Sequence, residues 1–146
     1  MHCKPLIGLN MDYRSAKKDS PAFAYVGAGY FDSILSAGGI PVVVPPMENA
    51  DELSCVLDRL QGFVMVGGQD LDPRRDGFML HPTVRPHDRR RETFDRMLIR
   101  LLADRRMPVF GIGVGMQLLN LSQGGNLFLH IAEDLPQAIP HKDPQD

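Results

Sequence analysis

Residues 108–120 read PVFGIGVGMQLLN. The first five of them form a short apolar run typical of a buried strand, and residues 115–122 have the apolar spacing of a helix. Three glycines, Gly111, Gly113 and Gly115, alternate with Ile and Val at the junction. Because glycine removes the clashes of a sharp turn, the pattern predicts a strand-to-helix elbow with Gly113 at positive φ.

Strands and helices alternate along the rest of the chain, and Gly or Pro separates them. Together with residues 108–112, short apolar runs predict strands over residues 5–10, 40–44, 62–66 and 126–131. Apolar spacings of three and four predict helices over residues 25–37, 51–60, 89–106 and 115–122. Polar or proline-rich composition predicts loops over residues 11–21, over residues 69–87 and over the last fifteen residues.

This alternation predicts the fold class. Strands that are apolar throughout, with helices between them, indicate an α/β fold with a doubly wound, mostly parallel sheet of the flavodoxin-like kind. Ligands bind such sheets beyond the carboxyl ends of the strands. Gly67 and Gly68 follow the third predicted strand, and the elbow at Gly113 follows the fourth. We therefore expect the two loops to share a site, into which the amide of Val114 points.

Composition excludes several classes of protein. The chain has 146 residues, 43% hydrophobic and 23% charged, with a net charge of −2, which predicts one folded domain over residues 1–146 and argues against disorder. The charge balance gives no general attraction to nucleic acid, and no apolar run reaches the ~18 residues of a membrane span. Cys3 and Cys55 make no disulfide framework, which fits a reducing, cytoplasmic environment.

A dinucleotide-binding loop is an alternative explanation for the alternating glycines. That fingerprint requires another glycine three positions after the second one, where this chain has Met116. It also follows the first strand of its fold, whereas these glycines lie in the second half of the chain. Both mismatches favour the elbow, and no cofactor is expected.

Several segments together resemble one family. The chain is similar to the first part of a class I glutamine amidotransferase-like domain, and most of all to the γ-glutamyl-γ-aminobutyrate hydrolase family of γ-glutamyl peptidases. The resemblance rests on order and spacing across the chain. Its segments are KPLIGLNMDY at residues 4–13, the AGGIPV of residues 37–42, VMVGGQDLDP at residues 64–73, RETFD at residues 91–95, the elbow of residues 108–120, and the glycine pair at residues 124–125.

The resemblance implies a chemistry and a site. In that family a cysteine at the elbow attacks a γ-glutamyl amide, a histidine takes its proton, an acidic residue orients the histidine, and backbone N–H groups stabilise the oxyanion. Carried over to this sequence, the nucleophile position falls on Gly113 and the oxyanion donors on Gly68 and Val114. Gly67 and Gln117 line the implied substrate site. No metal and no cofactor are implied.

The chain also departs from the family pattern. Gly113 has no side chain that could attack a carbonyl, Gln117 one turn later is no nucleophile, and Val114 stands where the family has arginine. The family's histidine and acid lie in a later H-P-E-like segment that is absent here, and His141 matches a polar loop position instead. Family members are considerably longer, so the resemblance implies the front portion of a larger domain, which on its own would expose an unpaired sheet edge or an apolar face.

Two functions remain open from the sequence. One is a hydrolase-family domain that is inactive as given, with the alternative that a longer parent carries the remaining catalytic residues. The other is a non-catalytic binding or assembly module that holds a γ-glutamyl or carboxylate compound around Gly68 and Val114. If the chain self-associates, a symmetric homodimer is the assembly to expect. Neither nucleic acid nor a membrane is an expected partner.

The cysteines and two aspartates have ordinary structural interpretations. Cys55 lies among apolar residues of a predicted helix and is expected to be a core thiol. His2 and Cys3 could bind a stray metal, but a flexible terminus is the favoured interpretation. Asp70 and Asp72 could be carboxylate ligands, although turn and cap roles beside the glycines are favoured.

The remaining basic residues carry two interpretations. Arg85 and the run of residues 89–91 are predicted to form a solvated helix face, the alternative being an anion contact at the mouth of the site. His81, His87 and His130 are isolated in the sequence and match no motif.

Overall fold

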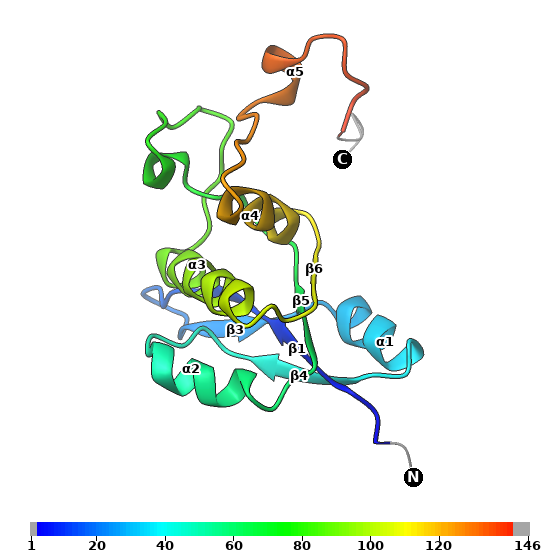
Figure 1. Cartoon of the computed structure of the whole chain (residues 1–146). Helices are drawn as coiled ribbons and strands as arrows, with labels where there is room; N and C mark the ends of the chain where they lie inside the picture. The colour runs from blue at the N-terminus through cyan, green and yellow to red at the C-terminus, as the bar shows by residue number, and fades with distance from the viewer. Residues whose placement is uncertain (1–2, 142–146) are drawn as a thin grey trace.

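A four-stranded parallel sheet forms the centre of the molecule in the computed structural model, which describes residues 3–141 (Figure 1). Its strands lie in the order β4-β1-β5-β6. They are β1 (Leu6–Asn10), β4 (Ile40–Val44), β5 (Gly62–Met65) and β6 (Val109–Gly111). Numbered among themselves, the strands follow the order 2-1-3-4, which is the beginning of the flavodoxin-like order. The predicted α/β fold with a parallel sheet is confirmed.

Helices cover both faces of the sheet. Helices α2 (Ala50–Leu57), α3 (Arg89–Asp104) and α4 (Val114–Ser122) cover one face, and α1 (Ala28–Ser36) covers the other. The short α5 (Ile131–Asp134) lies beyond α4 (Figure 1), and a 3₁₀ turn, η1, forms at Pro73–Asp76. Alternate residues of β5 point to opposite faces, because successive strand side chains alternate. Phe63 and Met65 belong to the larger core cluster, and Val64 packs against the smaller one.

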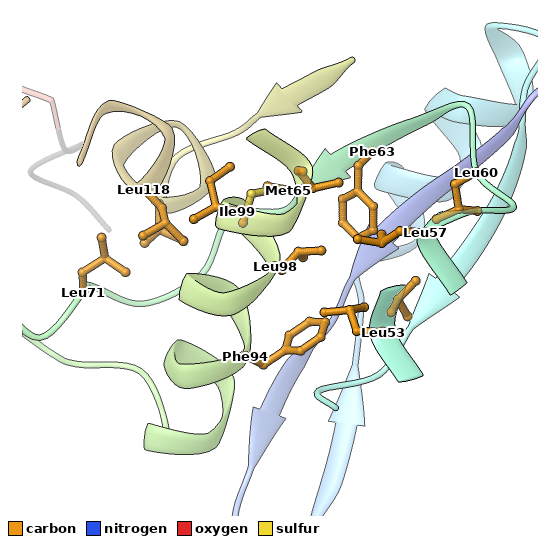
Figure 2. Packing of buried hydrophobic residues seen from close by; sticks show 13 residues of the cluster. Leu53, Leu57, Leu60, Phe63, Met65, Leu71, Phe94, Leu98, Ile99 and Leu118 are labelled. Atoms are coloured by element: carbon orange, nitrogen blue, oxygen red, sulfur yellow. The ribbon is translucent and has the colours of Figure 1, made fainter. Parts of the chain in front are cut away.

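The larger core lies between the sheet and helices α2, α3 and α4. Figure 2 shows Phe63 and Met65 of β5 packed beside Leu98 of α3 and Leu57 of α2. Phe94 of α3 belongs to the same core and is 1% exposed. The smaller core joins Ile34 of α1 to the opposite face of the sheet. Removing these side chains from water is the main contribution that holds the helices in place.

Side-chain caps fix where two of these helices begin. The Asn49 side chain accepts hydrogen bonds from the backbone N–H groups of Asp51 and Glu52, which begins α2. Asp88 accepts from the N–H of Arg90 and begins α3. Each cap satisfies donors that a helix leaves without internal partners.

The prediction of a loop over residues 11–21 is partly wrong. Its first residues form β2 (Asp12–Arg14), which pairs antiparallel with β3 (Phe23–Tyr25). The Tyr25 hydroxyl donates to Asp12 across this pair at 2.6 Å, and Arg14 lies over the rings of Phe23 and Tyr25. Strands of three residues are too short to show a period, and β3 includes Tyr25, which the helical pattern assigned to the start of the following helix.

The strand predicted over residues 126–131 is also wrong. Within the described residues this segment pairs with no strand, and the Asn126 carbonyl instead accepts from the Asn120 side chain at 2.8 Å. Part of the predicted final loop forms α5, in which the Asp134 carboxylate accepts from the His130 N–H. An apolar run without a neighbouring strand edge has no partners for a ladder, so local polar contacts decide its shape.

Cys55 is exposed, which corrects its prediction as a core thiol. It lies on the outer face of α2, whereas Leu53 and Leu57 face the core. Cys3 is exposed, and His2 lies outside the described residues. Across residues 3–141, no helix has the length and apolar character that crossing a membrane requires.

Candidate functional site

The elbow forms where α4 begins. Gly113 has φ 54° and ψ −116° and is the N-cap of α4, so the predicted positive φ is confirmed. The carbonyl of Ile112 accepts from the N–H of Gly115 at 2.9 Å, and the carbonyl of Gly113 accepts from Gln117 at 3.1 Å. These two bonds close the turn that takes the chain from β6 into the helix.

The glycines on either side of Gly113 are required by close packing. A Cβ at Gly111 would lie 2.6 Å from Leu119 Cδ1, and a Cβ at Gly115 would collide with the Met65 carbonyl oxygen. Gly113 is different, because a Cβ there would meet only the Cα of Gly67, at 3.6 Å. The elbow therefore has room for a side chain at position 113, although the sequence supplies none.

The glycine turn after β5 lies directly beside the elbow. Gly67 donates its N–H to the Tyr30 hydroxyl of α1 at 3.1 Å. The carbonyl of Met65 accepts from the N–H of Ile112, which ties the turn to the elbow at 2.9 Å. The 3.6 Å separation between Gly67 Cα and the Cβ position of Gly113 confirms that the two loops meet.

Two backbone donors in this region have no protein acceptor. Throughout residues 3–141, no group accepts a hydrogen bond from the N–H of Gly68 or of Val114. Val114 is the first residue of α4, where a helix leaves its N–H groups without internal partners and carries partial positive charge. These donors can interact with a carboxylate or an oxyanion.

Gln117 lies one turn along α4 and lines a cavity of about 710 Å³. The same cavity is lined by Asp70 and Val84 from the loop before α3, and by His130 and His141 from the segment after α4. Gln117 therefore has two contacts: its backbone N–H bonds to Gly113 in the elbow, and the residue also lines this cavity.

A buried network of polar side chains forms hydrogen bonds to the backbone of the glycine turn. Arg91 donates through Nε to Asp95 at 2.6 Å, and the other oxygen of Asp95 accepts from the Asn10 side chain at 2.8 Å. Asn10 accepts in turn from the N–H of Val66, and Arg91 reaches the Gly67 carbonyl at 3.4 Å. Burial raises the pKa of Asp95, and the charge of Arg91 opposes that shift.

Arg91 corrects the prediction of a solvated basic face. Its side chain is 0% exposed and also lies 3.3 Å from Asp12, whereas Arg89 and Arg90 of the same run are exposed. Arg90 lies over the Tyr13 ring at 5.0 Å. Of the three consecutive arginines, Arg91 is the one that reaches the glycine turn. It contacts the buried side of that turn and is not positioned to contact an anion at the entrance of the site.

His87 is a second buried group beneath the turn. A Cβ at Gly68 would lie 2.5 Å from its Cε1, so the ring packs against that glycine. Burial, together with the nearby positive charge of Arg91, lowers the pKa of His87 to about 4. Neither ring nitrogen has a hydrogen-bond partner within the described part of the chain. His87 is therefore neutral at physiological pH.

A comparison with known protein families matches residues 5–146 to peptidase C26. The chain belongs to the peptidase C26 family. The glycine turn and the elbow both lie within the matched residues.

Curated relatives agree with this assignment. A provisionally named glutamine amidotransferase of Mycobacterium tuberculosis is 38% identical over 136 residues, which cover 90% of this chain and 44% of that protein. Protein NtpR of Enterococcus hirae is 27% identical over 81% of this chain and 49% of its own. γ-Glutamyl-γ-aminobutyrate hydrolase of Escherichia coli O157:H7 is 27% identical over 78% of this chain and 44% of its own. The C26 chain thus spans about half the length of these relatives.

One solved structure is also similar. It is a protein of Thermoplasma acidophilum that is provisionally described as part of a GMP synthase, and it covers 84% of this chain and 47% of its own. The two share 19% sequence identity and a TM-score of 0.48.

Of the two aspartates after the glycine turn, Asp72 has the predicted cap role, whereas Asp70 contacts a distant part of the same loop. Asp72 caps η1 by accepting from the N–H of Arg74 at 3.0 Å, and Arg74 holds the pKa of that carboxyl below its usual range. Asp70 accepts from the N–H of Arg85 at 2.7 Å. Both carboxylates therefore shape the C26 loop before α3.

The histidines of the C26 chain are not isolated in space. The rings of His81 and His130 stack with centroids 4.9 Å apart, although 49 positions separate them in the sequence. His141 is exposed and lines the cavity. A local pattern could not have predicted the stacked pair, because it depends on the chain folding back after α4.

Proposed function

We propose that this C26 chain binds a γ-glutamyl compound, or another small carboxylate, at the amides of Gly68 and Val114 without cleaving it. The observation that carries the proposal is the elbow itself. Its backbone has the positive φ at Gly113, but the position has no side chain that could form a covalent intermediate.

The choice of ligand follows from two lines of support. Free N–H donors at the start of a helix favour a negatively charged oxygen, and α4 contributes its partial positive charge. Among the curated relatives, the E. coli protein is named a γ-glutamyl-γ-aminobutyrate hydrolase, which suggests the γ-glutamyl group. Hydrolysis is not part of the proposal, because it requires a nucleophile and a base in addition to these donors.

An assembly role is the second candidate, and one observation favours it. Phe110 of β6 is 66% exposed, and β6 lies at an edge of the described sheet. An unpaired strand edge with an exposed aromatic residue is a surface on which another chain can pair. This role is compatible with ligand binding at the elbow.

The test compares two substitutions at Val114. Val114→Pro removes the N–H at the first helical position, which tolerates proline, and Val114→Ala keeps the N–H while losing two side-chain carbons, more packing than the proline variant loses. Calorimetric titration with a γ-glutamyl anilide is expected to show binding about 10-fold weaker in Val114→Pro, corresponding to one charge-assisted hydrogen bond. Val114→Ala should bind like the unchanged chain.

The same samples are assayed for free glutamate. We expect saturable binding with no glutamate release above the buffer rate. Equal weakening in both Val114 variants would refute the amide contact, and glutamate release by the Gly113 chain would refute the non-catalytic function.

A further inference from the structure

A cluster of possible metal ligands lies away from the elbow. His81 comes from the loop before α3, and His130 and Glu133 come from the segment around α5, which Figure 1 shows beyond α4. A ring nitrogen from each histidine and a carboxylate oxygen lie within 4.8 Å of one another. The cluster therefore joins two segments that are distant in the sequence.

The spacing of the ligand atoms fits a small cation. His81 Nε2 lies 3.2 Å from one oxygen of Glu133, and His130 Nδ1 lies 3.3 Å from the other. With metal–ligand bonds of ~2.0–2.1 Å, two neighbouring ligands of a tetrahedral metal are separated by ~3.3 Å. Each contact has about that length, but they end on different oxygens of Glu133, so a site that uses one carboxylate oxygen keeps one of them as a tetrahedral edge.

The ring orientations support metal binding. His130 Nδ1 is buried and has no hydrogen-bond partner among residues 3–141, so one ring nitrogen is left for a ligand. His81 Nδ1 lies 2.7 Å from the Thr83 hydroxyl and 3.3 Å from the Thr83 backbone N–H, which donates to it, and these contacts turn Nε2 toward Glu133. Metal binding through Nε2 requires a proton on Nδ1, so the Thr83 hydroxyl would accept that proton and the bond from the Thr83 N–H would be given up.

A bound metal ion would balance the charges of this cluster better than protonation of both histidines. Pairing both histidines with Glu133 as ions would place two positive charges in rings stacked 4.9 Å apart with an interplanar angle of 13°. Like charges at that distance repel each other. A divalent cation instead binds two neutral rings and one carboxylate, and it carries the positive charge between them.

We propose that His81, His130 and Glu133 form a Zn²⁺ site with an open fourth position. Two imidazole nitrogens and one carboxylate oxygen are a ligand set that Zn²⁺ accepts, and catalytic zinc sites keep such an open position. His130 also lines the 710 Å³ cavity next to Gln117. Bound Zn²⁺ would fix the loop before α3 to the segment around α5.

The test is a calorimetric Zn²⁺ titration of the full chain, in a His2→Ala and Cys3→Ser background that removes terminal ligands. We expect one site per chain and, at saturating metal, a rise in Tm of roughly 5 °C, because ligands that bind only the folded state stabilise it. His81→Ala and His130→Ala should each weaken Zn²⁺ binding at least ~10-fold. His141→Ala, which removes an exposed histidine of the same cavity, should leave the affinity unchanged.

Two results would overturn the site. One is the absence of saturable binding by a chain whose circular dichroism shows that it is folded. The other is a Kd unchanged in the doubly substituted His81→Ala/His130→Ala chain, since binding would then occur elsewhere. Both readouts are independent of any enzymatic activity and of ligand binding at the elbow.

Discussion

Gly113 has a positive φ at a sharp strand-to-helix turn and carries no side chain. Its φ of 54° costs an ordinary L-residue on the order of 1–2 kcal/mol, yet a Cβ there would meet only the Cα of Gly67, at an ordinary contact distance of 3.6 Å. A side chain at this position would therefore be strained by the backbone and not by its neighbours. That difference leads to a test.

Gly113→Cys should produce a reactive thiol. The new side chain would lie at the N-terminus of α4, where the helix dipole lowers the pKa of a thiol. We expect alkylation by iodoacetamide near neutral pH to be at least ~10-fold faster than at Cys55. Stability should fall by about 1 kcal/mol because of the positive φ. Alkylation no faster than that of Cys55 would contradict the elbow geometry.

Arg91 is a buried charged residue whose replacement should cost much stability. Arg91→Met leaves Asp95 buried without its 2.6 Å partner, and breaking such a pair costs about 3–5 kcal/mol. The neighbouring Arg89 is exposed, so Arg89→Met should change stability by less than about 0.5 kcal/mol. Urea unfolding of the two variants measures the difference. Similar values for both would show that the network contributes little.

Among the secondary-structure elements, those with a clear local sequence pattern are predicted, and those that form only by pairing with another segment are missed. The four parallel strands and the elbow are predictable because continuous apolar runs and alternating glycines are local signals. The β2–β3 pair is not, since each strand has only three residues. Arg91 had a signal that could have been used: it shares the helical face of Phe94, Asp95 and Leu98, all of which are buried.

Strand β6 leads to a prediction about self-association. Phe110 is 66% exposed there, so Phe110→Lys should weaken concentration-dependent association by placing a charge at the sheet edge. Sedimentation velocity over a range of concentrations measures the effect. Met116→Lys changes a 57% exposed residue of α4 and serves as the matched control. Association that depends equally on both positions would argue against pairing through β6.

At the scale of the whole molecule, His87 links stability to pH. Its folded pKa of about 4 lies below the ordinary 6.5, so between these values the unfolded chain binds the proton more readily. Stability is therefore lost as the pH falls from about 6.5 to about 4, by about 3 kcal/mol in total. His87→Gln should remove this part of the pH dependence. Urea unfolding at about pH 7 and pH 4 tests it by giving the free energy of unfolding at each pH. The same loss of stability between the two pH values in both chains would contradict a buried neutral histidine.

In the molecule as a whole, a C26 domain carries an elbow with glycine at position 113, and we propose that it binds a γ-glutamyl compound without cleaving it. A two-dimensional NMR titration of the isotope-labelled chain with a γ-glutamyl amide, followed over several hours, tests binding and the absence of cleavage at once. We expect saturable shifts of the Gly68 and Val114 amide resonances and no growing signal from free glutamate. Unmoved resonances at both amides, or accumulation of glutamate, would contradict the proposal.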